Sequence, residues 1–254
     1  MKKGKYLVLL TIFILSCIIF YQDPYAMSEK KILLGPTLEN ILGCDNLGRD
    51  IFSRLVLGSF NTLIISFISS TLAITFGVLI GSIAGYYGKF LDGVIMTLVE
   101  VIISIPGILI ALGIIIILGT GFHSLVVAIF VIYIPRCVNV VRGLVKKEKN
   151  MEYVVAAKTY GVKDLKIIYI HILPNILKPI LVAFTTGFAG AILTEAGLGY
   201  LGLGIQPPYP TLGNILNQSQ SYFLSAPWFT IAPGIAIIFT VYQIKKLEKR
   251  GRKY

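Results

Sequence analysis

Two ionisable side chains stand inside long apolar runs of this sequence. Glu100 lies within the run 93–118, and Arg136 lies within the run 125–141, directly after a proline. A charge at membrane depth is costly, and it usually pairs with another charge, reaches the interface or contacts a transported solute. The two residues could therefore pair between neighbouring helices, extend to the cytoplasmic side or contact a substrate. A proton relay would need more such groups.

The residue patterns that commonly carry catalysis are missing from the sequence. It has no glycine-rich phosphate loop, no HExxH and no GxSxG. Cys17, Cys44 and Cys137 have no paired spacing, and so indicate neither a disulfide framework nor a metal site. His123 fits a membrane interface, and the isolated His171 fits packing or hydrogen bonding. We expect no catalytic residue and no bound metal in this chain.

A dense group of opposite charges precedes the apolar run 61–86. The segment 43–58 reads GCDNLGRDIFSRLVLG. Its glycines permit tight turns, and its two aspartates and two arginines are close enough in sequence to form ion pairs with one another. The residues of interest are Gly43, Asp45, Gly48, Arg49, Asp50, Ser53 and Arg54.

A polar and basic stretch, residues 155–174, lies between strongly apolar runs. The pair Ala156–Ala157 falls in a short predicted helix, and Gly161 offers a stop with positive φ. Four apolar residues spaced i, i+3, i+4 and i+7 then define one face of a second helix, which begins near Asp164 and ends at Pro174. The spacing predicts a compact helix–turn–helix. The four apolar residues are Leu165, Ile168, Tyr169 and Ile172.

A third stretch, residues 197–216, reads GLGYLGLGIQPPYPTLGNIL. Repeated glycines and three prolines cannot form a spanning helix, so they predict a rigid re-entrant or surface loop. The candidate residues there are Gly202, Gly204, Gln206, Pro207, Pro208 and Gly213.

The composition identifies the setting of these stretches. The chain has 254 residues, of which 56% are hydrophobic and only 14% charged, and its mean hydropathy is +0.81. These values define an integral membrane protein, and the lack of alternating strand patterns makes it all-α. The net charge of +11 could indicate nucleic-acid binding. However, the basic residues gather at the ends of apolar runs, which is typical of membrane orientation.

Six apolar runs are long enough to predict transmembrane helices. The basic loop 142–178 and the basic tail indicate the cytoplasmic side, and 197–225 contains no Lys or Arg and is predicted outside. Both termini are then cytoplasmic. The first run could instead belong to a cleaved signal peptide, although it stays apolar beyond Cys17. The six runs are 6–21, 61–86, 93–118, 125–141, 179–196 and 226–243.

The basic stretch resembles the EAA loop of ABC-importer permeases, which reads Glu-Ala-Ala, three residues, Gly, nine residues and Ile-x-Leu-Pro. Five positions fit, while Val155 replaces the first Glu and His171 replaces the Ile. The resemblance implies that this loop docks into a separate ATPase and carries its motion to the membrane. The implied coupling residues are Glu152, Val155, Ala156, Ala157, Gly161, Asp164, Leu173 and Pro174.

The other two stretches resemble signatures of the peptide and nickel branch of the same family. Residues 43–58 are similar to GTDxxGRDxxSRxxxG, with Cys44 in place of Thr, and residues 195–216 are similar to EAGLSFLGLGxQPPxPxWGxML, with Leu212 in place of Trp. The resemblance implies that the second of these segments faces a binding protein and the outer mouth of a pathway.

The chain is thus identified as a member of the ABC-importer permease family, in its dipeptide, oligopeptide and nickel branch. The resemblance implies six transmembrane helices with a cytoplasmic coupling-helix loop between helices four and five. Residues 1–57 would hold the first helix and an external loop, and 58–254 the permease domain. The expected cargo is di- or oligopeptides, and nickel or a nickel chelate is the alternative.

The resemblance also implies the partners of the chain. They are a second homologous permease in a heterodimer, two ATP-binding subunits that hold ATP and Mg²⁺, an extracellular solute-binding protein and the lipid bilayer of the cell membrane. No nucleic acid and no cofactor in this chain are expected. A membrane-embedded enzyme would need paired catalytic residues at membrane depth, and an ion channel would work without nucleotide.

Overall fold

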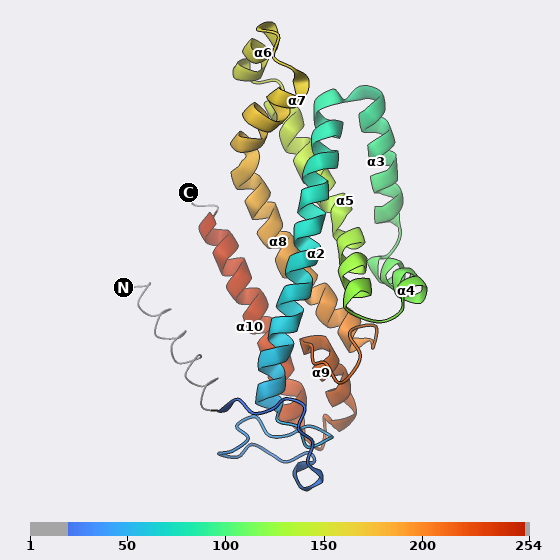
Figure 1. The fold of residues 1–254 in the computed structure, drawn as a ribbon, viewed down its shortest axis with the longest axis vertical. Helices are drawn as coiled ribbons and strands as arrows, with labels where there is room; N and C mark the ends of the chain where they lie inside the picture. Colours follow the sequence, from blue (N-terminus) through green and yellow to red (C-terminus); the bar gives the residue numbers. More distant parts are fainter. Residues whose placement is uncertain (1–19, 252–254) are drawn as a thin grey trace, which may run out of the picture. The chain divides into compact units, whose positions relative to one another are not determined.

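The computed structural model describes residues 20–251, and in this range every regular element is a helix (Figure 1). Four helices are long and apolar enough to cross a membrane, and a bent pair makes up to five. The predicted first span, 6–21, lies outside the described residues except for its last two. The four are α2 (Ile51–Tyr87), α5 (Phe122–Glu148), the continuous run Asp164–Tyr200 and Pro227–Lys246 within α10 (Pro227–Gly251).

The described chain divides into two compact units. The first unit combines residues 20–64 with 195–240, and the second combines 65–194 with 241–251. Several long helices contribute one part to each unit, because the division falls within α2, α8 (Leu173–Tyr200) and α10.

In the second unit, α2 and α5 pack backbone to backbone along a row of glycines. A Cβ atom at Gly81 would lie 2.8 Å from the carbonyl oxygen of Val138, and one at Gly85 would lie 2.7 Å from that of Arg142. Small residues let helix backbones approach closely in lipid, and these glycines of α2 make such a contact. α3 (Lys89–Ser104) and α4 (Gly107–Leu118) both pack against α5.

The predicted third span, 93–118, is broken at the Ser104-Ile105-Pro106 sequence, where the sequence indicates a break. α3 ends at Ser104, α4 begins at Gly107, and the two helices are bent by 90°. Ile105 is extended, with φ −90° and ψ 128°, because the ring of Pro106 excludes the helical conformation from the residue before it. The pair is therefore a broken span or a re-entrant segment.

The basic stretch of the second unit forms two helical parts, as predicted. α6 (Glu152–Thr159) ends in a Schellman motif: Gly161 has φ 74°, its N–H donates to Lys158 O, and the N–H of Val162 donates to Ala157 O at 3.1 Å. In Figure 1 this part stands beyond the ends of α5 and α8.

The second helical part differs from the predicted one. α7 (Asp164–Lys166) passes into a π-helical turn, Ile167–Ile172, which continues directly into α8. Pro174 does not end the helix, which runs on from the π-helical turn through α8 to Tyr200. The π-helical turn also shifts the buried face. Ile167 is fully buried, whereas Leu165 and Tyr169 of the predicted face are 59% and 51% exposed.

The first unit holds a long loop before α2 and a short helix after α8. The loop, 20–50, contains one 3-10 turn, Glu29–Lys31. α8 stays helical through Gly197 and Gly199 to Tyr200, so the turn-rich stretch predicted from residue 197 begins later than expected. Residues 201–211 form the loop, and α9 (Leu212–Ser219) with a 3-10 turn, Gln220–Tyr222, follows. α9 presents Leu212 and Ile215 to the interior, where both are fully buried.

Candidate functional site

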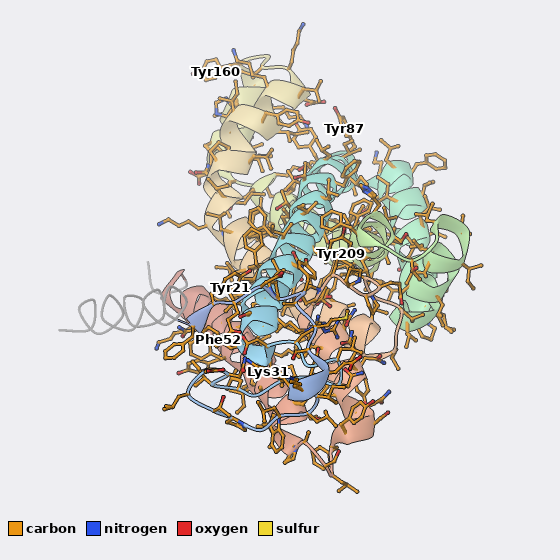
Figure 2. The ribbon with its side chains drawn as sticks, turned by 60° about the horizontal axis from the view of Figure 1, so that its bottom comes forward. Tyr21, Lys31, Phe52, Tyr87, Tyr160 and Tyr209 are labelled. Atoms are coloured by element: carbon orange, nitrogen blue, oxygen red, sulfur yellow. The ribbon has the colours of Figure 1, made fainter. Side chains whose placement is uncertain are left out.

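Around α6, the basic stretch exposes apolar and aromatic side chains beside polar and charged ones. On α6, Val154 is buried, whereas Val155 is 55% exposed and Ala156 is also exposed. Tyr160 follows the helix at its end and is 87% exposed, standing clear of the ribbon in Figure 2. These exposed apolar side chains are available for packing against another protein. Glu152 is exposed in the first turn of α6, where the helix dipole favours an anion.

Beneath α6, a buried apolar cluster anchors α6 and the π-helical turn on α2 and α5. Val154 and the π-helical turn pack with Val141 and Val145 of α5 and with the ring of Tyr86 of α2. Ala157 packs against the same cluster, so the two alanines of the resemblance point in different directions. α6 is therefore a small helix with one face anchored and the other open.

Tyr153 ties α6 to the end of α5. Its hydroxyl donates to Glu148 Oε2 at 2.5 Å. Burial, and then this hydrogen bond to a carboxylate, raise the pKa of Tyr153 above its ordinary value, so the hydroxyl stays protonated and remains a donor at neutral pH.

In the first unit, Asp45 is the centre of the charged loop. Its Oδ2 accepts from Arg49 Nε at 2.7 Å and lies 3.4 Å from Arg54 Nε, and all three residues are buried. Its Oδ1 accepts from the backbone N–H of Leu47 and of Arg49. The predicted ion pairs among these charges are thus present for Asp45. A buried ion pair offsets the cost of removing its charges from water only when additional hydrogen bonds of this kind are made.

Asp50 has a different role from the predicted ion pairing. It precedes α2, and its Oδ2 accepts from the backbone N–H of Ser53 at 2.8 Å and from the Ser53 hydroxyl at 2.6 Å. This is the geometry of a helix N-cap. Its Oδ1 accepts from Asn40 Nδ2 at 2.9 Å, and Ser53 Oγ accepts from the backbone N–H of Gln22 at 2.9 Å.

The charged loop is connected to α9 through Gln218. Arg49 Nη2 and Arg54 Nη2 both donate to Gln218 Oε1, at 3.1 and 3.3 Å. Gln218 Nε2 in turn donates to Asn214 Oδ1, and Asn214 Nδ2 donates to Ile205 O at 2.7 Å. One continuous network therefore joins the two signature stretches, which are far apart in the sequence.

The loop 201–211 is held by hydrogen bonds within itself and to α2, where Asn61 Nδ2 donates to Pro210 O at 2.8 Å. Gln206 Nε2 donates to the carbonyl oxygens of Gly202 and Gly204, both at 3.1 Å. Gly213 fits directly against α8, since a Cβ there would lie 2.4 Å from Ala196 O. Pro207 and Pro208 are exposed on the outside of the loop.

The two charges predicted at membrane depth do not pair with each other. Glu100 and Arg136 are both exposed on the unit, and neither takes part in a salt bridge among residues 20–251. The ion pair of this region instead joins α3 to α5, with Arg142 Nη2 donating to Asp92 Oδ2 at 2.6 Å and Arg142 Nε to Asp92 Oδ1.

Arg136 borders a small pocket between α5 and α8 of about 220 Å³. Tyr133, Thr186 and Gly187 also line this pocket. Its walls are therefore mostly small or apolar side chains around one cation.

Three residues with structural roles were not singled out from the sequence. Glu195 is fully buried in α8, with the hydroxyls of Thr62 and Thr211 as polar neighbours, although neither has hydrogen-bond geometry to it. Gln218 is partly buried, carries no charge and lies in no matched motif, and Tyr86 lies at the end of an apolar run. Of the three, Glu195 alone lies in a stretch that resembles a family signature, residues 195–216.

Two of the cysteines lie in the described part of the chain. Cys44 and Cys137 are free and buried. Within residues 20–251, no three His, Cys, Asp or Glu side chains gather as they would around a metal ion.

The fold and these surfaces define a helical membrane permease. A family model described as "Binding-protein-dependent transport system inner membrane component" matches residues 77–246. The chain belongs to this family, as the resemblance implied, and is a transport subunit rather than an enzyme.

Relatives cover nearly the whole chain. It is 39% identical to the dipeptide transport system permease protein DppC of Alkalihalophilus pseudofirmus over 249 residues, which are 95% of this chain and 82% of the relative. It is 36% identical to the di/tripeptide transport system permease protein DppC of Pseudomonas aeruginosa, covering 93% and 82%. With the glutathione transport system permease protein GsiD of Pectobacterium atrosepticum, identity is 38%, covering 82% and 69%.

Solved structures share the fold. An inward-facing form of the MetNI methionine ABC transporter aligns with a TM-score of 0.68 at 21% identity, covering 80% of this chain and 97% of that one. An amino acid ABC transporter aligns with a TM-score of 0.59 at 20% identity, covering 80% and 95%.

Proposed function

We propose that this chain forms part of the pathway through which an ATP-driven importer moves di- and oligopeptides. The observation that carries the proposal is the near full-length similarity to dipeptide permeases, which includes the three signature stretches. Its complex would contain a second homologous permease, two ATP-binding subunits and an extracellular binding protein. ATP and Mg²⁺ would be held by the ATP-binding subunits, and this chain would supply wall and hinge.

The cytoplasmic partner surface in this proposal is α6. Its open face is apolar and lined by small residues, and its other face is anchored on a buried cluster. A partner that packs against Val155, Ala156 and Tyr160 would therefore move α6 together with the helices beneath it, because α6 is anchored on them.

The outer surface in this proposal is the loop 201–211 with α9. Residues 197–225 contain no Lys or Arg, which favours the outside of the membrane. The network from Asp45 through Gln218 to Asn214 would keep this surface rigid while a binding protein docks. The complete topology would have six spans, with 6–21 as the first and both termini in the cytoplasm.

Within the membrane, Arg136 would face the pathway or the second permease. An exposed cation in the middle of α5 needs a polar surrounding. The α-carboxylate of a peptide is an anion that a guanidinium binds in a fixed geometry. Glu100, exposed on α3, would correspondingly attract the peptide amino group.

The proposal is tested by assembly and uptake. The chain is coexpressed with a homologous second permease and with ATPase subunits, purified by a tag, reconstituted in proteoliposomes with a peptide-binding protein and supplied with a labelled dipeptide. We expect ATPase subunits to co-purify and uptake to require ATP hydrolysis. Ala156→Trp, which places a large side chain on the open face of α6, should abolish co-purification or reduce uptake at least about tenfold.

The matched control is Phe90→Trp, on a side chain that is 79% exposed at the start of α3. It should leave assembly and uptake unchanged. Uptake without nucleotide, or normal assembly together with normal uptake in Ala156→Trp, would contradict the proposed function.

A further inference from the structure

We infer that Tyr86 is a positioning residue that makes α2 and the coupling stretch, residues 152–174, move as one body. This inference rests on the proposed function, because it concerns how motion delivered to α6 reaches the spanning helices. All the groups involved belong to the second unit.

The first observation is a hydrogen bond across a long sequence separation. Tyr86 Oη, at the end of α2, donates to Asp164 Oδ1 at 2.6 Å, and Asp164 opens α7 directly after α6 and its turn. Tyr86 is only 2% exposed, so its hydroxyl has no ready exchange with bulk water. A hydrogen bond to a carboxylate in such a place is stronger than one between neutral groups.

The second observation is that the same ring receives two cations from two other segments. Lys158 Nζ of α6 lies 5.4 Å from the ring centroid, and Lys149 Nζ, just after α5, lies 5.5 Å from it. Both distances are within the range of cation–π attraction. One aromatic side chain of α2 therefore contacts the end of α5, α6 and α7.

The third observation is that, within residues 20–251, no other hydrogen bond or ion pair joins α2 to α7 or to the π-helical turn. The rest of the interface is apolar packing of Tyr86 with Val145, Val154 and Ile168. Apolar packing holds surfaces together but is not directional. The Tyr86–Asp164 hydrogen bond is directional, and it therefore sets how α7 is oriented relative to the axis of α2.

Close packing then extends this connection into the membrane. Gly85, next to Tyr86, meets the backbone of α5 directly, with a Cβ there lying 2.7 Å from Arg142 O. A displacement of α6 would thus pass through Asp164 and Tyr86 to α2 and, by contact, to α5. Position alone does not demonstrate coupling, so the test must measure coupling itself.

Tyr86→Phe separates this role from packing. It keeps the ring, its apolar contacts and both lysine contacts, and it removes only the hydroxyl. In proteoliposomes containing the whole complex, we expect dipeptide transported per ATP hydrolysed to fall about three- to tenfold, because a hydrogen bond to a charged group is lost. Co-purification with the ATPase subunits, melting temperature and basal ATP hydrolysis should change little.

Two further variants define the partner. Asp164→Ala should lower the same ratio by a similar factor, and combining it with Tyr86→Phe should cause no further loss, since both remove one interaction. Asp164→Asn keeps an accepting oxygen and should retain most of the coupling. Tyr87→Phe is the matched control, because Tyr87 is adjacent and 40% exposed, and its hydroxyl makes no hydrogen bond to the described residues.

An unchanged ratio in Tyr86→Phe, or an equal loss in Tyr87→Phe, would overturn the inference. If Tyr86→Phe does not fold, the comparison of Asp164→Ala with Asp164→Asn decides, and equal behaviour of these two would also overturn it. A failure of the proposed function is recognised separately, since the unaltered complex would then show no ATP-dependent uptake at all.

Discussion

At the scale of single residues, Glu195 is the carboxyl group with the most demanding surroundings. It is fully buried in α8. Thr62 Oγ1 already accepts from the N–H of Leu212, and Thr211 Oγ1 accepts from that of Asn214. Each hydroxyl therefore has its own hydrogen available for the Glu195 side chain, which would join α8, α2 and the start of α9.

We expect Glu195→Gln to be tolerated and Glu195→Lys to be damaging. Gln keeps the shape and an accepting oxygen, so the loss of stability should be about 1 kcal/mol or less. Lys places a buried cation against hydroxyl donors, which should cost at least about 3 kcal/mol. Thermal unfolding of the purified complex in detergent measures the difference. Equal destabilisation by the two substitutions would show that the hydroxyls do not engage this side chain.

Cys44 should react slowly with thiol reagents. Its side chain is fully buried, and burial, followed by the nearby Asp50 carboxylate, raises the pKa of the thiol. The raised pKa leaves less of the reactive thiolate at neutral pH, and the rate of alkylation should increase as pH rises. With Cys17 and Cys137 replaced by serine, N-ethylmaleimide should modify the folded protein at least about tenfold more slowly than the SDS-unfolded protein, because reaction requires local opening. Equal rates at pH 7 would contradict the buried placement.

At the scale of elements, the contact between α2 and α5 depends on glycine. A Cβ at Gly81 would lie 2.8 Å from Val138 O and 2.9 Å from Val141 Cβ. We expect Gly81→Ala to destabilise the protein by about 1–3 kcal/mol, because the helices would have to separate. Gly113→Ala in α4 is the control. No atom lies within 4 Å of its Cβ position, so a better helix former should leave stability unchanged or raise it by up to about 1 kcal/mol. Melting temperatures of both variants should move in opposite directions, and a shared direction would refute the packing argument.

The sequence predicted where helices end or break when a local rule decides the backbone conformation. Gly161 ends α6 because only a residue tolerant of positive φ completes its Schellman motif, and Pro106 breaks the third span because it restricts Ile105. The π-helical turn Ile167–Ile172 packs with Val141 and Val145 of α5, a contact between distant segments that no local pattern reports. A period of 3.6 residues therefore placed Leu165 and Tyr169 on the wrong face.

The candidate site was predictable to the same extent. Stretches with unusual residue types, such as 43–58 and 197–216, were visible because charge, glycine and proline stand out against apolar runs. Gln218, which connects them, is an ordinary amide whose importance arises only from its position between Arg49 and Arg54. Tyr86 was hidden for the same reason.

At the scale of the whole molecule, orientation in the membrane follows from charge. The loop 142–178 is rich in Lys and Arg, whereas 197–225 has none. Tyr160 and Tyr209, both labelled in Figure 2, are 87% and 59% exposed within these two segments and are suited to labelling. We expect opposite accessibility for cysteines at these positions, because the excess of positive charge stays in the cytoplasm.

The experiment uses a variant in which the three native cysteines are replaced by serine. A membrane-impermeant maleimide is added to cells whose cytoplasmic membrane is intact and whose outer envelope has been made permeable to the reagent. Tyr209→Cys should be labelled at once, and Tyr160→Cys only after the cytoplasmic membrane is permeabilised. Lys30→Cys, in the loop that follows the run 6–21, should behave like Tyr209→Cys if that run crosses the membrane from a cytoplasmic N-terminus. Labelling of Tyr160→Cys in intact cells would place α6 on the side that contains no ATP, and no ATPase could then act on it.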